Sequence, residues 1–324
     1  MSDTPTPRTH WTDIPMVGIA AVGLSTIFFG CVPFFARSLT EAGIAPPAIA
    51  FCRYLFPAIA FLPFLKVRGE QGRASLWGYF SGLTVGLGWV GYVKSLTLMP
   101  VSAAGVLYMT YPLFTLVVGW LLFADRPSLR AAIGGGLILL AAALAAGGVK
   151  AGASAGQTIA PVAILFALAA PVAFGLSINV LARKLHVLPP VSRMGIFAIG
   201  AATGLVPLIL TYPRAAVVPS TPDQWALALA LGTFSALIPQ LLYSVFVPKI
   251  GGAKAAALGS IELPTMFAVG WFAFGELIGP REFLAGALVL TAILITPSRR
   301  RLPSVTATLA APAPRKRSWF RGWR

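Results

Sequence analysis

The chain has 324 residues, of which 57% are hydrophobic and only 10% are charged, and its mean hydropathy is +0.82. In soluble domains about a quarter of the residues are charged. The composition therefore excludes a soluble globular protein and predicts an integral membrane protein, whose formal net charge of +16 has to be explained by its loops and tails.

Apolar segments of about 20 residues, the length that a helix needs to cross a bilayer, follow one another along the chain with short polar turns between them. The first is long enough to span the membrane, and residues 1–13 lack the basic region of a signal peptide, so we expect this helix to be retained. We predict an all-α protein with ten transmembrane helices and no soluble domain of useful size. The predicted spans are 14–36, 46–65, 74–93, 101–124, 130–149, 158–181, 190–211, 224–247, 253–275 and 280–297.

Basic residues near the helix ends indicate which turns face the cytoplasm, because Lys and Arg are biased to that side. With a cytoplasmic N-terminus, the cytoplasmic turns hold twice as many Lys and Arg as the opposite turns, even before the arginine-rich tail 298–324 is counted. Both termini are therefore predicted to be cytoplasmic. The tail is rich in Pro and Ala and is predicted to be disordered against anionic lipid headgroups. A nucleic-acid partner is not expected, because topology already accounts for the charge.

Two halves of the chain resemble one another. A Gly-Trp pair, an acid five residues later and a glycine ten residues beyond the acid occur twice at an offset of 151, and "FFARSL" at 34–39 resembles "VLARKL" at 180–185. We predict two five-helix repeats, 14–149 and 150–297. Because five is odd, the second repeat enters the membrane from the opposite side, an inverted topology typical of transporters that rock about a midplane site. The matched residues are Gly119-Trp120 with Gly270-Trp271, Asp125 with Glu276, Gly135 with Gly286, Tyr92 with Tyr243, and Ala104 with Ala255.

The segments "GWLLFADRPSLRAAIGGGLIL" and "GWFAFGELIGPREFLAGALVL" resemble the ends of the two repeats in EamA-type permeases of the drug/metabolite transporter superfamily. The resemblance covers nearly the whole chain except the tails, with a looser match in the sixth and seventh helices and with Asp125 where a glutamate is usual. It implies a ten-helix carrier of the bacterial inner membrane, with both termini inside, that exports amino acids or other small metabolites.

Prolines interrupt the predicted spans at matched positions. A proline removes an N–H and frees the carbonyl four residues back, and broken helices form the midplane sites of many transporters. Pro33 matches Pro171 in the first helix of each half, Pro112 matches Pro264 in the fourth, and Pro239 is a further interruption. We expect helix breaks that line a cavity. The alternative is a set of kinks whose backbone is satisfied by neighbouring Ser, Thr or water.

A small number of polar and aromatic residues lie near these breaks. Together they are typical of a lining for a small amphiphilic solute, which is the partner that we expect. The alternative is that several of them tie helices together or belong to the interfacial aromatic belt, above all Tyr92 and Tyr243. The predicted binding residues are Glu262, Asn179, Gln240, Tyr108, Tyr111, Trp89, Tyr92, Tyr243 and Ser260, with Ser244 close by.

Glu262 is the most informative of these residues, because it is an acid in the otherwise uncharged stretch "GSIELPTMF". About nine residues into its span, or roughly 13 Å at 1.5 Å per residue, it lies near the middle of a hydrocarbon core about 30 Å thick. A charge there costs about 2.5–3.5 kcal/mol, so it must be paired, protonated or turned toward the bundle interior. Three roles stay open: a counter-charge for a substrate ammonium, a proton site that couples transport to pH, or a structural acid bonded to Arg53, Arg193 or freed backbone. Related carriers place the acid directly before the proline, whereas Leu263 intervenes here and turns the acid by about 100° around the helix.

The other charges of the spans are given structural roles. Arg53 and Arg193 are expected to reach backbone carbonyls or to snorkel to the membrane interface. Asp125 and Glu276 lie at helix ends beside turns, where a carboxylate is expected to cap the helix that follows it.

The sequence carries no signature of catalysis. Its histidines, His10 and His186, lie outside the spans, and Cys31 and Cys52 form neither a pair motif nor a metal spacing. There is no Gly-rich loop ending in Gly-Lys-Ser/Thr, so no enzyme, metal or cofactor is expected. The leading hypothesis is a secondary carrier that exports amino-acid-like metabolites by alternating access. Uptake is the alternative direction, a non-transporting scaffold or sensor is the alternative class, and a homodimer is left open.

Overall fold

The computed structural model describes residues 15–65, 71–147 and 160–296, and the described part is helical with no strand. The predicted tails, 1–13 and 298–324, lie outside it. The helices of the first half are α1 (Pro15–Gly30), α2 (Val32–Glu41), α3 (Pro46–Phe61), α4 (Gln71–Ser95), α5 (Val101–Tyr108), α6 (Tyr111–Phe123) and α7 (Leu129–Gly147). Those of the second half are α8 (Pro161–Lys184), α9 (Pro190–Ile209), α10 (Arg214–Val217), α11 (Pro222–Gly232), α12 (Ile238–Ile250), α13 (Gly252–Gly259), α14 (Glu262–Phe274) and α15 (Pro280–Ile295), with a 3-10 turn, η2 (Leu62–Phe64), and a π-helical turn, η3 (Thr233–Leu237).

Within the described residues each predicted span lies on one or more helices, but not every span meets a simple criterion for crossing a membrane. Among the described residues, eight helical stretches are long and apolar enough to do so. The predicted spans 74–93 and 280–297, which are α4 and α15, are not among the eight. The reasons differ: α15 has only 16 residues, whereas α4 carries glycines where a membrane helix usually carries aliphatic side chains. The full set of ten crossings stays a prediction.

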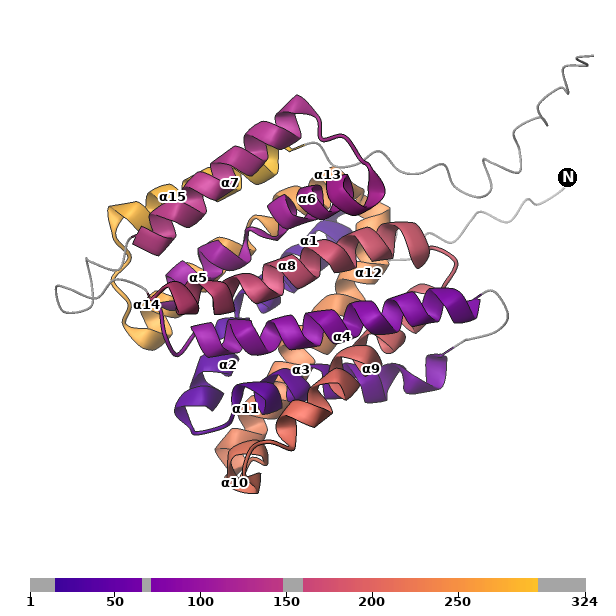
Figure 1. Ribbon diagram of the computed structural model, residues 1–324, viewed down its shortest axis with the longest axis vertical. Helices are drawn as coiled ribbons and strands as arrows, with labels where there is room; N and C mark the ends of the chain where they lie inside the picture. The colour runs from indigo at the N-terminus through magenta and orange to yellow at the C-terminus, as the bar shows by residue number, and fades with distance from the viewer. Residues whose placement is uncertain (1–14, 66–70, 148–159, 297–324) are drawn as a thin grey trace, which may run out of the picture.

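The helices stack in layers, from α7 and α15 at one edge of the bundle to α9 and α11 at the other (Figure 1). Two pairs of helices that the sequence repeat makes equivalent pack directly on each other, α7 on α15 and α3 on α9, and the two broken helices, α5–α6 and α13–α14, meet where α5 packs on α14. Such pairing is expected when two similar halves are related by a two-fold axis through the bundle. The sequence match at an offset of 151 therefore has a counterpart in the packing.

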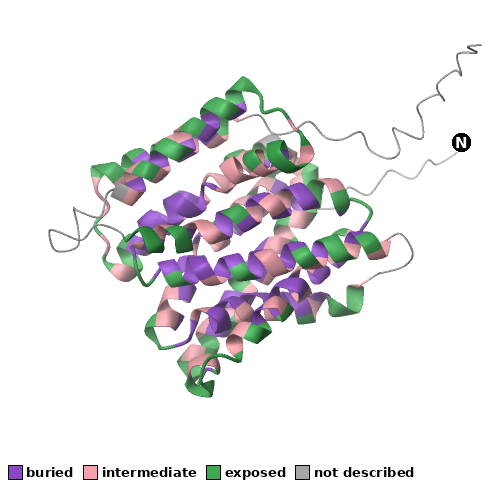
Figure 2. Cartoon of the chain, viewed as in Figure 1, coloured by how far each residue is buried: buried purple, intermediate pink, exposed green. Residues whose placement is uncertain are grey.

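Apolar side chains cover the outside of the bundle as well as its interior. Large exposed side chains include Leu139, Trp120 and Phe272, and Figure 2 shows exposed residues along the outer sides of α6, α7 and α15 and buried ones concentrated in α4, α5 and α9. A soluble protein rarely exposes continuous apolar surface. This surface is suited to lipid chains.

Of the five predicted prolines, three lie at interruptions of the helices, and Pro239 is the second residue of α12, directly after the π-helical turn η3. Pro33 and Pro112 are the second residues of α2 and α6, and Pro264 is the third residue of α14, positions where a missing N–H costs little. The predicted break at Pro171 is wrong, because α8 runs without interruption from Pro161 to Lys184. The reason lies in α4: a Cβ on Gly88 would meet the backbone carbonyl of Ala169 at 2.7 Å, so α4 is packed directly against α8 beside the proline.

Glycine allows α4 and α9 to approach one another closely. A Cβ built on Gly82 would collide with the backbone carbonyl of Phe197, and one built on Gly200 would collide with that of Tyr79. Small residues at membrane helix crossings permit this kind of backbone contact, and it is a main source of stability where no water is displaced. This crossing of α4 and α9 holds α3 and α9 on one side of the site described below.

We expect Gly200→Ala to lower the free energy of unfolding by about 1–3 kcal/mol, because an extra carbon forces two backbones apart. The melting temperature in detergent measures the effect. Gly136→Ala is the matched control: it is also a helix-interior glycine, in α7, but a Cβ there meets nothing within 4 Å. Equal melting temperatures for the two variants would contradict the close crossing.

Candidate functional site

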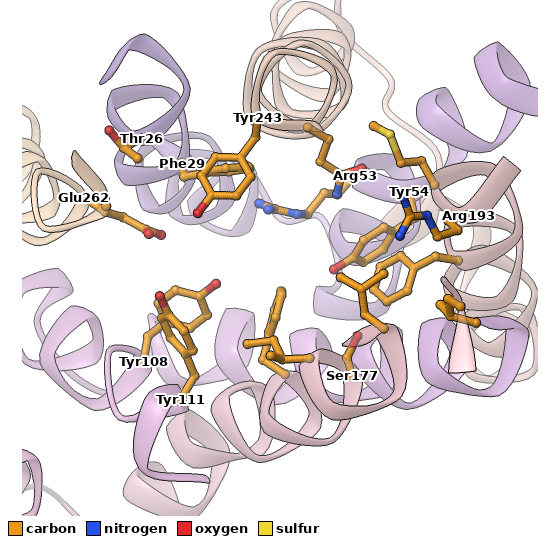
Figure 3. A pocket seen from close by; sticks show the side chains of 18 residues that line it. Thr26, Phe29, Arg53, Tyr54, Tyr108, Tyr111, Ser177, Arg193, Tyr243 and Glu262 are labelled. Carbon is orange, nitrogen blue, oxygen red and sulfur yellow. The ribbon is translucent and has the colours of Figure 1, made fainter. Parts of the chain in front are cut away.

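A cavity of about 320 Å³ lies in the middle of the bundle, where the interrupted helices meet. Tyr108 and Tyr111 flank the interruption between α5 and α6, and Gly259 and Glu262 flank that between α13 and α14. Residues of α1, α3, α8, α9 and α12 complete the lining. The cavity thus takes residues from both halves of the chain (Figure 3).

Five of the nine predicted binding residues line this cavity, and four do not. Those in the lining are Glu262, Gln240, Tyr108, Tyr111 and Tyr243; those outside it are Asn179, Trp89, Tyr92 and Ser260.

Asn179 serves packing rather than the cavity lining. Its side chain is buried, and Nδ2 donates hydrogen bonds to the carbonyls of Thr115 and Gly175, each at 2.9 Å. The bond to Thr115 ties α8 to α6, and the bond to Gly175 lies within α8. Ser260, at the α13–α14 interruption, directs its hydroxyl at 3.5 Å toward the carbonyl of Ala256 in its own helix.

Arg53 is a cavity residue, and its expected snorkelling is wrong. The residue is only 4% exposed, in the middle of α3. Its guanidinium carbon lies 3.9 Å from the ring centre of Trp89 and 5.9 Å from that of Tyr54, while Nη1 is 3.5 Å from Ser235 Oγ. Its Nε is buried without a hydrogen-bond partner in the described part of the chain. Among the residues that the structure describes, the charge is therefore held by aromatic faces and pairs with no carboxylate.

Trp89 and Tyr92 stand behind the cavity instead of facing it. Trp89 supports the Arg53 guanidinium, and its ring centre lies 4.9 Å from that of Tyr92. Tyr92 contacts Tyr108 at 5.3 Å, and Tyr108 contacts Tyr111 at 6.0 Å. This run of four rings connects the arginine to the α5–α6 interruption and fixes the wall of the cavity.

Glu262 is the first residue of α14 and points into the cavity from the side opposite Arg53. Figure 3 shows its carboxylate and the Arg53 side chain on opposite sides of the cavity, with the Tyr243 ring between them in this view. The ion pairs among the described residues join other groups, so Glu262 and Arg53 are not in direct contact. Of the three roles left open for Glu262, a structural acid bonded to Arg53 or Arg193 therefore has no support in these contacts.

Several lining residues were not predicted as binding residues. Arg193, Thr26, Phe29, Tyr54 and Ser177 line the cavity, together with apolar side chains of α8 and α9. Arg193, in the first turn of α9, is half-buried. The sequence offers a signal for the two arginines alone, since a charge within an apolar span is functional by default.

The expected caps by Asp125 and Glu276 are wrong in their target. The helix after Glu276 is capped by Glu282, whose Oε2 accepts from the Gly279 N–H at 3.0 Å. The helix after Asp125 is capped by Ser128, whose hydroxyl accepts from the Ala131 N–H at 3.2 Å. Glu276 instead accepts from the first N–H groups of α5, in the other half of the chain, and Asp125 pairs with an arginine of α8.

Within the described ranges, no three His, Cys, Asp or Glu side chains gather into a set that could hold a metal ion. The lining itself offers charged groups, hydroxyl groups and aromatic faces to a solute.

Comparison with known proteins places the chain in a family. The model of the EamA-like transporter family matches residues 16–147 and 161–297. A curated relative, an uncharacterized transporter of Archaeoglobus fulgidus, is 25% identical over 295 residues, which are 88% of this chain and 98% of the relative. A protein of known crystal structure has a similar fold, with a TM-score of 0.58 and 19% identity over 85% of this chain and 96% of that one. The chain is a multi-pass membrane protein and belongs to the EamA-like transporter family.

Proposed function

We propose that this family member is a secondary transporter that exports small zwitterionic metabolites, amino acids being the leading class, by alternating access around the central cavity. The observation that carries the proposal is the pair of opposite charges, Arg53 and Glu262, which face one another across the cavity without touching.

An unpaired charge inside a membrane protein is costly, and it persists where it has a function. An α-amino acid would bring a carboxylate to Arg53 and an ammonium to Glu262, so that a single small molecule would pair both charges. The planar guanidinium is suited to a carboxylate, which it can bind through two parallel hydrogen bonds. The tyrosine rings of the lining offer apolar surface together with a polar hydroxyl, and a volume of about 320 Å³ suits a small metabolite.

The helix interruptions support alternating access. The half-helices α6 and α14 begin at the cavity, whereas α5 and α13 end there. Helix ends present unpaired backbone groups and a partial charge to whatever lies next to them. Two inverted repeats of five helices, each contributing one broken helix to a midplane site, would produce this arrangement, and the packing of equivalent helices on each other agrees with it.

The remaining parts of the proposal follow from the charge distribution. Both termini are proposed to be cytoplasmic, which the excess of Lys and Arg in the corresponding turns supports, and a bacterial inner membrane is the expected location. The basic tail 298–324, which is proposed to bind anionic headgroups, lies outside the described residues. Members of the family are transporters, so a non-enzymatic function of this chain agrees with its family. A homodimer and the export direction stay proposals.

The test is transport by the purified protein in proteoliposomes, measured as counterflow of labelled amino acids and amphiphiles. We expect saturable flux for a set of zwitterions and none for the same molecules lacking either the ammonium or the carboxylate. Absence of flux for every solute, with folding verified by thermal melting, would contradict the carrier function. Flux that is indifferent to removal of either charged group would contradict the zwitterion.

A further inference from the structure

Outside the cavity, two ion pairs join the halves of the chain to one another. Arg37 of α2 binds Glu276, with Nη1 2.7 Å from Oε1, and its guanidinium carbon lies 4.4 Å from the ring centre of Phe274. Arg183 of α8 binds Asp125, and its guanidinium carbon lies 4.5 Å from the ring centre of Phe123.

The two clusters are equivalent in the sequence repeat. Glu276 and Phe274 match Asp125 and Phe123 at the offset of 151, and Arg37 matches Arg183 in the pair "FFARSL" and "VLARKL". In each cluster the arginine comes from one half and the acid and the phenylalanine come from the other. The same device is therefore built twice, once from each half.

The clusters lie at opposite ends of the bundle. The broken helix formed by α5 and α6 starts at Val101, which contacts Glu276, and ends at Phe123, close in sequence to Asp125. Its 23 residues span about 34 Å at 1.5 Å per residue. The cavity residues Tyr108 and Tyr111 lie between the two ends. We call the end with Glu276 the α2 end and the end with Asp125 the α8 end.

At the α2 end, Glu276 binds the first residues of α5. Besides Arg37, its carboxylate accepts hydrogen bonds from the Val101 N–H at 2.6 Å, the Ser102 N–H at 3.1 Å and the Ser102 hydroxyl at 3.2 Å. A carboxylate is stabilised at the N-terminus of a helix by the free N–H groups and the helix dipole. Every residue of α5 is buried, and none of α2 lines the cavity, whereas the lining reaches Leu185 and Arg193 on the side of the α8 end.

We propose that Glu276 is the gate residue of the α2 end, with Arg37 as the positioning residue that holds its carboxylate over α5. A solute can pass this end only after the N-terminus of α5 separates from Glu276, while the Arg37–Glu276 pair keeps the acid from becoming an unpaired buried charge. By the repeat, Asp125 and Arg183 occupy the equivalent gate position at the α8 end. This proposal rests on alternating access, but its test reads accessibility and needs no substrate, so a failure of the proposed transport function would leave it standing.

The test measures how fast a cysteine at Phe29, in the cavity lining, reacts with a membrane-impermeant thiol reagent that is added to one side of oriented proteoliposomes. We call the membrane side at the α2 end the α2 face and the side at the α8 end the α8 face. The background is Cys31→Ser and Cys52→Ser, so Phe29→Cys supplies the reactive thiol. We expect slow labelling from the α2 face in the parent. Glu276→Gln and Glu276→Ala should each raise that rate by about tenfold, as hydrogen bonds to a charged group are lost, and should lower the rate from the α8 face. Local unfolding cannot mimic this result, because it would raise both rates.

Glu282→Gln is the matched control, since Glu282 also accepts a hydrogen bond at the start of a helix but does so within its own helix, α15; it should leave both rates unchanged. As a second measurement, a short thiol cross-linker between Ser102→Cys and Glu276→Cys should abolish labelling from the α2 face, and cleavage of the linker should restore it. Unchanged labelling from the α2 face in both Glu276 variants, equal increases from both faces, or labelling that persists after cross-linking would overturn the proposal.

Discussion

Replacing Arg53 with methionine is expected to lower transport on the order of a hundredfold or more and to leave the melting temperature unchanged or raised. Truncating one partner of a desolvated, charge-assisted contact costs about 2–5 kcal/mol of binding, and here the contact would be with the substrate carboxylate. The protein itself loses no ion pair, because Arg53 rests on Trp89 and Tyr54. Replacement of a buried charge by an apolar side chain of similar volume is often neutral or stabilising, and methionine packs well against aromatic rings.

Initial rates of counterflow in proteoliposomes and melting in detergent measure the two effects on one protein sample. Arg73→Met is the matched control, because Arg73 is an exposed arginine of α4 that lies outside the cavity lining; it should transport normally. Arg53→Lys should recover only part of the activity, since an ammonium lacks the planar fork that binds a carboxylate at two points. Normal transport by Arg53→Met, or loss of activity together with a large drop in melting temperature, would remove Arg53 from the binding site.

Patterns that depend on the chain alone predicted the fold well. The apolar spans correspond to helices, and the family resemblance is confirmed by the family match. The division into two inverted repeats stays a prediction. The proline pattern predicted interruptions at Pro33, Pro112 and Pro264 but also one at Pro171, where no break exists. A proline shows that one backbone bond is missing; whether the helix stops there depends on what packs beside it.

The face that each side chain presents could not be predicted. In a membrane bundle both the lipid side and the protein side of a helix are apolar, so hydrophobic periodicity does not separate them as it does in a soluble protein. Asn179 was therefore indistinguishable from Gln240, although the first ties α8 to α6 and the second faces the cavity. The contact of Glu276 with α5 joins residues 175 positions apart, a distance beyond the reach of a local capping rule.

Glu262→Gln is expected to lower transport of zwitterions by tenfold to a hundredfold, on the order of the cost of a lost contact between charged groups. Analogues of these solutes that lack the ammonium should bind to the Glu262→Gln variant at least as well as they bind to the parent protein. The amide keeps the size of the carboxylate and removes only its charge. The measurement compares initial counterflow rates for a zwitterion with competition by its deaminated analogue. Asp223→Asn is the control, because Asp223 also lies in the first turn of a helix, α11, but is exposed; it should change neither quantity.

The two cavity charges can then be tested together. Because the two residues would bind one solute as a unit, their effects on transport should be far from additive. The double variant Arg53→Met/Glu262→Gln should therefore transport zwitterions about as poorly as Arg53→Met alone. If Glu262 instead served a coupled proton, Glu262→Gln would retain counterflow and lose only its response to a pH gradient, a result that would contradict the ammonium site. Additive losses in transport would show that the two charges do not act on the same molecule.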